Sequence, residues 1–130
     1  MTGIPAVLTD ADLPLAERMA ARLDGELFPI DTGHCAIDQP DTPELRLAAV
    51  LAGRPPRYIA DLGTAAWVWH AAARPQRIEL CVALGARARL SDPRGAVVRE
   101  VVIAAHELRR LGGRHVTSPL RPAMDFARVR

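Results

Sequence analysis

The stretch Leu108-Arg109-Arg110-Leu111-Gly112-Gly113-Arg114-His115-Val116-Thr117 decides the fold, because it predicts a tight β-hairpin. Its two adjacent glycines supply the positive φ angles that a two-residue hairpin turn requires. Upstream, the β-branched run 97–103 predicts another strand. Before it, Ile78, Leu80 and Val82 alternate with polar residues, which predicts a half-buried strand with one polar face. The C-terminal half is therefore predicted to be built around a sheet.

Four helices are predicted to accompany these strands. The first covers 13–23 after a capping Asp12, with a buried stripe formed by Leu13, Ala16, Met19, Ala20 and Leu23. The second ends at Leu51, and its start allows two interpretations: Thr42 caps with Pro43 first, or Asp41 caps with Glu44 closing a box. The third covers 64–73, and the fourth begins at Ser118, which caps it with Pro119 at the first helical position.

Strands and helices do not alternate strictly along the chain, because a hairpin over 26–38 and a short strand over 57–60 stand among the helices. This order predicts an α+β fold with a mainly antiparallel sheet and four helices. Residues 1–40 hold one helix and one hairpin, a degenerate winged-helix-like part. Residues 41–130 form a second α+β module, and we expect the two to make one compact unit.

The basic residues are all arginine, seventeen of them, with no lysine. This excludes enzymes that need a P-loop lysine, a Schiff-base lysine or a lysine general base. The charge is also divided unequally. Residues 1–53 hold three arginines and nine acids, a balance of −6, whereas residues 54–130 hold fourteen arginines and six acids, a balance of +8. Such asymmetry suggests an anionic partner for the basic half, or mutual neutralisation of the halves within one chain or across a dimer.

Seven arginines on predicted strands and turns form the candidate nucleic-acid-binding set: Arg87, Arg89, Arg94, Arg99, Arg109, Arg110 and Arg114. A sheet face lined in this way can meet phosphate groups. The alternative is a solvated face whose charges are matched by Glu79, Glu100 and Glu107. Trp67 and His70, on the predicted third helix, are candidates for contact with a protein partner or with a second copy of the chain.

No catalytic, metal or cofactor site is recognised. His34-Cys35 is the one adjacent metal-capable pair, and zinc needs three or four ligands. An enzyme would need a site assembled from His34, His70, His106 and acids from across the fold. We therefore expect a non-enzymatic protein with no small-molecule substrate.

Residues 1–15 lack a basic cluster and a long apolar run, and no window reaches the roughly 18 apolar residues of a membrane span. We expect a cytoplasmic protein with no membrane partner. Cys35 and Cys81 are expected to be reduced thiols.

The segment Val116-Thr117-Ser118-Pro119-Leu120-Arg121-Pro122-Ala123-Met124-Asp125-Phe126-Ala127-Arg128 resembles the end of the AbiEi-type antitoxin module, from actinobacterial regulators of the type IV toxin–antitoxin class. Within it, Thr117, Ser118, Pro119, Arg121 and Asp125 form the structural motif, with Arg121 and Asp125 spaced to pair on one helix face. The stretches 60–70 and 23–28, and Asp41-Thr42-Pro43, fit as well, so the likeness spans roughly residues 10–128.

The resemblance implies a non-enzymatic transcriptional regulator in which a DNA-binding winged helix precedes an antitoxin domain. Two features depart from the family pattern. Pro122 stands where threonine is expected, and it removes a backbone donor near the start of the last helix. The winged helix is incomplete, because only one helix precedes residue 41 and a helix-turn-helix needs two.

Overall fold

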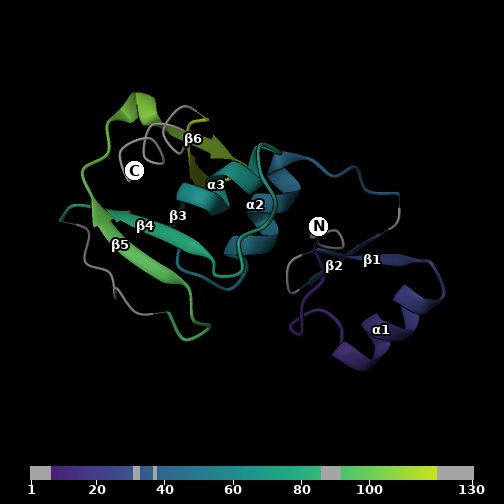
Figure 1. Ribbon diagram of the computed structural model, residues 1–130. Coiled ribbons are helices and arrows are strands. Elements are labelled where there is room, and N and C mark those ends of the chain that lie inside the picture. Colours follow the sequence, from purple (N-terminus) through teal and green to yellow (C-terminus); the bar gives the residue numbers. More distant parts are fainter. Residues whose placement is uncertain (1–6, 31–32, 37, 86–91, 120–130) are drawn as a thin grey trace.

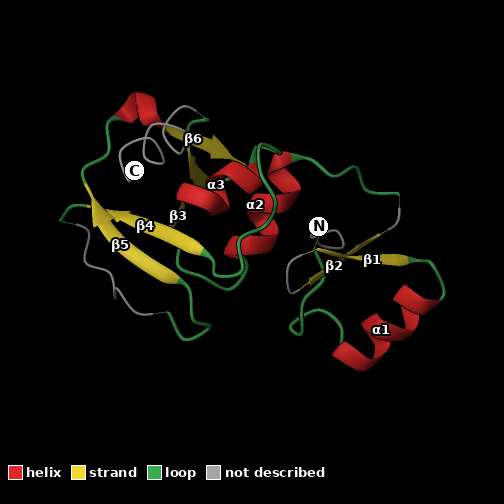
Figure 2. Cartoon of the chain, in the orientation of Figure 1, coloured by secondary structure: helices red, strands yellow, loops and turns green. Residues whose placement is uncertain are grey.

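The computed structural model describes residues 7–30, 33–36, 38–85 and 92–119. In this part of the chain, a helix and a hairpin precede a five-stranded sheet with two helices against one face (Figures 1 and 2). The elements are α1 (Leu15–Leu23), β1 (Leu27–Ile30), β2 (Gly33–Ala36), α2 (Pro43–Leu51), β3 (Ile59–Ala60), α3 (Leu62–Val68), β4 (Glu79–Ala83), β5 (Val97–Val101), the 3-10 helix η1 (Ala105–Glu107), β6 (Leu108–Leu111) and β7 (Arg114–Thr117). The predicted α+β class is confirmed.

The five-stranded sheet has the order β5-β4-β3-β7-β6 and is mixed. The β3–β4 and β6–β7 pairs are antiparallel, whereas β4–β5 and β3–β7 are parallel. With the separate β1–β2 hairpin, antiparallel pairs outnumber parallel ones by three to two. The parallel pairs were not predicted, because hairpin signals report only local pairing and not which strand of a hairpin joins the rest of the sheet.

The β6–β7 hairpin matches its prediction at every residue. Leu111 pairs with Arg114 across a two-residue turn, and Gly112 and Gly113 have φ values of 57° and 82°. Positive φ at both turn positions is the geometry that glycine adopts without a steric penalty. This hairpin places β7 in the sheet beside β3, where Val116 is fully buried.

The core lies between the sheet and the pair α2 and α3. Leu47 and Leu51 of α2 and Val68 of α3 meet Leu80 and Val116 of the sheet, all essentially without exposed surface. These side chains are small aliphatic groups, as the low aromatic content of the chain requires.

Of the two interpretations of the start of α2, the structure has the threonine cap. Thr42 Oγ1 accepts a hydrogen bond from Leu45 N at 3.2 Å, and Pro43 occupies the first helical position. Asp41 instead accepts two hydrogen bonds of 2.8 Å from the guanidinium of Arg46.

The predicted helix over 64–73 is wrong at both ends, because α3 begins at Leu62 and ends at Val68. The chain leaves the helix at His70, which has a φ of 62°. His70 N donates to Trp67 O at 3.0 Å and Ala71 N donates to Ala66 O at 2.8 Å, the pair of bonds that defines a Schellman motif. The stop was missed because histidine stands where glycine usually signals it.

The predicted buried stripe of the first helix is also wrong. Of its five members, Leu13 is half-buried and Ala16, Met19, Ala20 and Leu23 are exposed, with Leu23 exposed by 86%. The buried residue of α1 is Arg18, whose guanidinium donates to Leu8 O and pairs with Asp10. The predicted Asp12 cap is wrong as well: Pro14 holds the N-cap position, while Asp12 accepts a hydrogen bond from Thr9 N at 3.0 Å.

The N-terminal part contains one helix, α1, and one hairpin. No second helix lies among its described residues, 7–30 and 33–36, so the winged-helix-like expectation is not confirmed. Most of the predicted fourth helix falls within 120–130, outside the described residues. The longest described helices have nine residues each, and none in this part of the chain meets the length and hydropathy that a membrane span requires.

Candidate nucleic-acid interface

Five of the seven arginines in the candidate set lie in the described part of the chain, and Arg87 and Arg89 lie outside it. Arg99 is on β5 and Arg110 on β6, the two opposite edges of the five-stranded sheet. With strands about 4.8 Å apart, four strand spacings put their backbones roughly 19 Å apart. The described arginines therefore do not form one continuous sheet face.

Arg99 is matched by an acid inside the protein. Its Nε donates to Asp61 Oδ2 at 2.8 Å, and its Nη2 lies 2.7 Å from the same oxygen. Asp61 is fully buried at the end of β3, and its other oxygen, Oδ1, is buried with no hydrogen-bond partner in the described part of the chain. Asp61, which was not among the acids considered as partners from the sequence, is therefore a partner of Arg99, and the pair joins β5 to the end of β3.

Glu79 borders this ion pair on β4. Burial raises the pKa of Glu79 above its ordinary value, although the hydrogen bond from Gly63 N to Oε1, at 3.2 Å, acts in the opposite direction. A Cβ added at Gly63 would approach Glu79 Oε1 to 2.7 Å, so a larger residue at this position would displace the end of the Glu79 side chain. These residues stabilise the junction of β3, α3 and β4.

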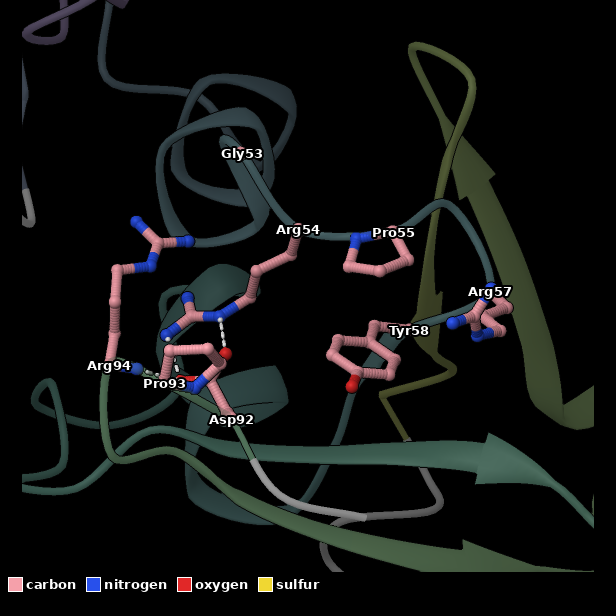
Figure 3. A pocket seen from close by; sticks show the side chains of 8 residues that line it. All are labelled: Gly53, Arg54, Pro55, Arg57, Tyr58, Asp92, Pro93 and Arg94. Atoms are coloured by element: carbon pink, nitrogen blue, oxygen red, sulfur yellow. Dashed lines mark hydrogen bonds and ion pairs between the residues drawn. The ribbon is translucent and has the colours of Figure 1, made fainter. Parts of the chain in front are cut away.

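A different group of arginines surrounds a hollow where the loop after α2 meets the turn before β5 (Figure 3). The hollow has a volume of about 370 Å³. The residues that line it come from two segments of the chain: Gly53, Arg54, Pro55, Arg57 and Tyr58 from the first, and Asp92, Pro93 and Arg94 from the second. We call it the arginine hollow.

An ion pair between Arg54 and Asp92 joins the two segments. Arg54 Nε donates to Asp92 Oδ1 and Nη2 donates to Oδ2, both at 3.1 Å, and the side chains are only 5% and 3% exposed. Arg54 Nη1 also donates to Val50 O at the end of α2. Asp92 Oδ2 accepts further bonds from Arg94 N at 3.1 Å and Ala96 N at 3.0 Å.

The bonds to Asp92 keep its carboxylate charged. The hydrogen bond from Arg54 is the largest of the causes that lower the pKa of Asp92 to about 2. Because Arg54 neutralises this carboxylate, the one acid among the residues that line the hollow does not repel an incoming anion.

Arg57 and Arg94 flank the ion pair, on opposite sides of it in Figure 3. Arg57 is exposed and, among the described residues, pairs with no carboxylate. Arg94 Nη2 donates to Ala52 O at 2.5 Å, which places its guanidinium beside the end of α2.

Arg114 approaches the same loop from β7, where its Nη1 donates to Arg54 O at 2.9 Å. On β6, Arg109 Nη1 donates to His106 O at 2.8 Å and to Leu108 O at 3.1 Å, and Arg110 is exposed. In the described part of the chain, none of these three arginines forms an ion pair with a carboxylate. Among the described residues, no acid neutralises the charges of these three arginines.

The two candidates for partner contact differ in exposure. The Trp67 side chain is in the core at 8% exposure, and Arg46 lies over its ring at 5.0 Å from the centroid. It therefore has little surface to offer to a partner. His70 is exposed after α3, with Nε2 3.9 Å from Asp41 Oδ1.

The described residues of the C-terminal motif contact the rest of the fold. Thr117 O accepts a hydrogen bond from Trp69 Nε1 at 2.8 Å, and Ser118 N donates to Glu107 O at 2.6 Å. Pro119 is exposed, and Arg121 and Asp125 lie outside the described residues. Thr117 and Ser118 are buried, so their contacts join β7 to α3 and η1.

The histidines considered for a catalytic site lie on separate elements. His34 is buried on β2, His70 follows α3, and His106 is in η1. Across the described residues, no three His, Cys, Asp or Glu side chains gather in a way that could hold a metal ion. Cys35 and Cys81 are buried and are not joined in a disulfide.

Arg54, Arg57 and Asp92 were not predicted from the sequence to be parts of one site. The only local signal is the run Gly53-Arg54-Pro55-Pro56-Arg57, in which two arginines bracket two prolines. Proline restricts the backbone and so fixes where the flanking side chains start. The meeting with Asp92, 38 residues away, is a tertiary contact that no local pattern reports.

Comparisons of the chain with protein-family models, with curated proteins and with solved structures found no match.

Proposed function

We propose that this chain is a non-catalytic regulatory protein, similar to an antitoxin or transcriptional regulator, that contacts DNA through arginines of its C-terminal part. The observation that carries the proposal is the arginine hollow and its surroundings. Arg57 and Arg94 flank it, Arg114 is bonded to its rim, and its one carboxylate is already neutralised by Arg54. Arginine suits phosphate recognition because its planar guanidinium donates two parallel hydrogen bonds.

The interface in this proposal centres on the hollow and not on one face of the sheet. Arg109 and Arg110, on the edge strand β6, add positive charge but are not among the residues that line the hollow. Contacts of this kind go to the phosphate backbone, so they give affinity and orientation without reading the base sequence.

Fluorescence anisotropy of a labelled duplex at rising salt concentration tests the proposal. Each phosphate contact releases counterions, so the logarithm of the binding constant should fall linearly with the logarithm of salt, by about 0.9 per contact. Three or four contacts predict a slope of about −3. Binding that is absent at low salt, or that does not change with salt, would contradict the proposal.

A second candidate function is supported by the surface of α1. Leu15, Met19 and Leu23, spaced four residues apart, are all exposed. Together with the opposite charges of the two halves, this apolar row favours a self-associating subunit whose α1 packs against a second copy of the chain. Light scattering over a concentration series, with Leu23→Ser as the variant, tests it: a strict monomer at every concentration would exclude this function.

A further inference from the structure

We propose that protonation of His34 releases α1 from the β1–β2 hairpin, which makes the N-terminal part of the chain a switch that opens in mild acid. This switch does not depend on DNA binding. His34 is only 4% exposed, although the imidazole of histidine gains its charge close to neutral pH. Charging a buried imidazole costs free energy, so an arrangement that buries the ring is favoured only while the ring is neutral.

The His34 side chain lies on the side of the hairpin that faces α1. Leu8 N donates to His34 O at 2.7 Å and His34 N donates to Leu8 O at 2.9 Å, so the two residues form a β-bridge. Successive residues of a strand face opposite sides, and the next residue, Cys35, belongs to the hydrophobic core that includes α2. Figure 1 shows α1 on the side of the hairpin away from α2, and Arg18 of α1 donates to the same Leu8 O at 3.2 Å.

Across the described part of the chain, the charged groups that act on the His34 ring are both cations. Burial has the largest effect on the pKa of His34, and Arg18 and Arg22, one turn apart on α1, lower it further. The acid bonded to this group is Asp10, which pairs with Arg18 and has a side chain that is 83% exposed. A proton on His34 therefore adds a third positive charge beside Arg18, which is itself only 2% exposed.

Few apolar contacts hold α1 to the hairpin, so a small electrostatic cost is enough to release it. Of the nine residues of α1, Arg18 is buried, Ala21 is half-buried and the other seven are exposed. The bonds from Arg18 to Leu8 O and Asp10 attach the helix. In contrast, α2 has five buried residues within the core. An element with so little buried apolar surface opens locally, at a free energy below that of global unfolding.

The direction of the effect follows from which state binds the proton more readily. When α1 is released, the pKa of His34 returns to its ordinary value of 6.5, whereas in the closed state it lies below that value. The closed state is therefore fully stabilised above about pH 6.5 and loses stability as the pH falls below it. A single group changes the opening equilibrium by at most about tenfold per pH unit.

Amide hydrogen exchange of the ¹⁵N-labelled full chain at pH 7.5 and pH 5.5 tests the switch, with each rate corrected for the pH dependence of the exchange chemistry itself. At the lower pH, protection of the α1 amides should fall severalfold, by up to about tenfold. At both pH values it should be lower than the protection of α2, because α1 opens without the rest of the fold. Protection of α1 that is equal at the two pH values, or equal to that of α2, would overturn the switch.

Substitutions assign the effect to His34. His34→Leu removes the titrating ring and should leave α1 equally protected at both pH values, whereas the matched control His106→Gln, at an exposed histidine of η1, should retain the full change. If His34→Leu does not fold, Arg22→Gln takes its place, because removing one cation should make the imidazole C–H signal of His34 titrate at a higher pH in low salt. A change in protection that His34→Leu retains, or a His34 titration that Arg22→Gln leaves unchanged, would overturn the switch.

Discussion

Arg54 and Asp92 form the most buried ion pair described in this chain, and each depends on the other. Replacing one partner leaves the other charge buried and uncompensated, which typically costs about 3–5 kcal/mol. We predict that Asp92→Asn lowers the free energy of unfolding by about 3 kcal/mol, measured by urea denaturation. Asp24→Asn, at an exposed position, is the control and should change it little. A loss below about 0.5 kcal/mol for Asp92→Asn would show that the pair contributes little.

The same pair gives the protein an acid-sensitive component of stability. The pKa of Asp92 is about 2 in the folded state, below its ordinary value of 3.8, so the unfolded chain takes up the proton first. The stabilisation should be complete above about pH 4 and be lost as the pH falls through about 2. Acid denaturation followed by circular dichroism should show this loss in the parent protein and a smaller one in Asp92→Asn. Identical acid profiles would contradict the assignment.

His34 predicts a second pH dependence, nearer neutrality. Both of its ring nitrogens are buried and have no hydrogen-bond partner among the described residues, and burial, followed by the charges of Arg18 and Arg22, lowers its pKa below 6.5. Because the unfolded chain binds the proton more readily, stability should be full above pH 6.5 and decline as the pH falls below that value. Urea denaturation at pH 7.5 and pH 5.0 measures the decline. His34→Leu should reduce it, whereas His106→Gln, at an exposed position, should not.

The C-terminal ends of α1 and α3 have the same backbone geometry, but only one of them could be predicted from the sequence. Both α1 and α3 close with Schellman bonds: Gly25 N donates to Arg22 O and Glu26 N to Ala21 O, as His70 and Ala71 do after α3. Gly25 has a φ of 78° and His70 one of 62°. The first helix end could be predicted because glycine marks it, and the second could not.

Substitutions at these two positions test the interpretation. A side chain in the left-handed region costs roughly 1–2 kcal/mol, so His70→Gly should raise the free energy of unfolding by about 1 kcal/mol. Gly25→Ala should lower it by a similar amount, and a Cβ there meets no atom within 4 Å, so the effect is one of backbone strain. Urea denaturation of both variants gives the comparison. Destabilisation by His70→Gly would mean that contacts of the imidazole outweigh the strain.

Local sequence patterns predicted an element correctly where its turn or its cap requires particular residue types. The Gly112-Gly113 turn determines the β6–β7 register, and the Thr42-Pro43 start determines where α2 begins. The buried stripe of α1 failed because periodicity identifies an apolar face without identifying what covers it. In this helix, Arg18 turns inward to satisfy Leu8 O and Asp10, and the apolar row is left at the surface.

At the scale of the whole molecule, the division of charge after residue 53 was visible in the sequence, but the shape of the basic surface was not. The sequence predicted that the arginines on the strands line one face of the sheet. In the structure Arg99 is bonded to the buried Asp61, and the hollow instead gathers Arg57 and Arg94 around an ion pair. Which arginines are matched by acids depends on contacts between residues about 38 positions apart, so composition alone cannot decide it.

The salt dependence of DNA binding by paired charge variants tests the central claim most directly. Arg57→Gln/Arg94→Gln and the control Arg22→Gln/Arg74→Gln each remove two exposed positive charges, and only the first pair borders the hollow. Anisotropy from 50 to 200 mM salt should give the control the slope of the parent protein. The hollow variant should bind more weakly, with a slope shallower by about one unit, the value for one lost phosphate contact. Equal slopes and affinities for the two double variants would contradict the account.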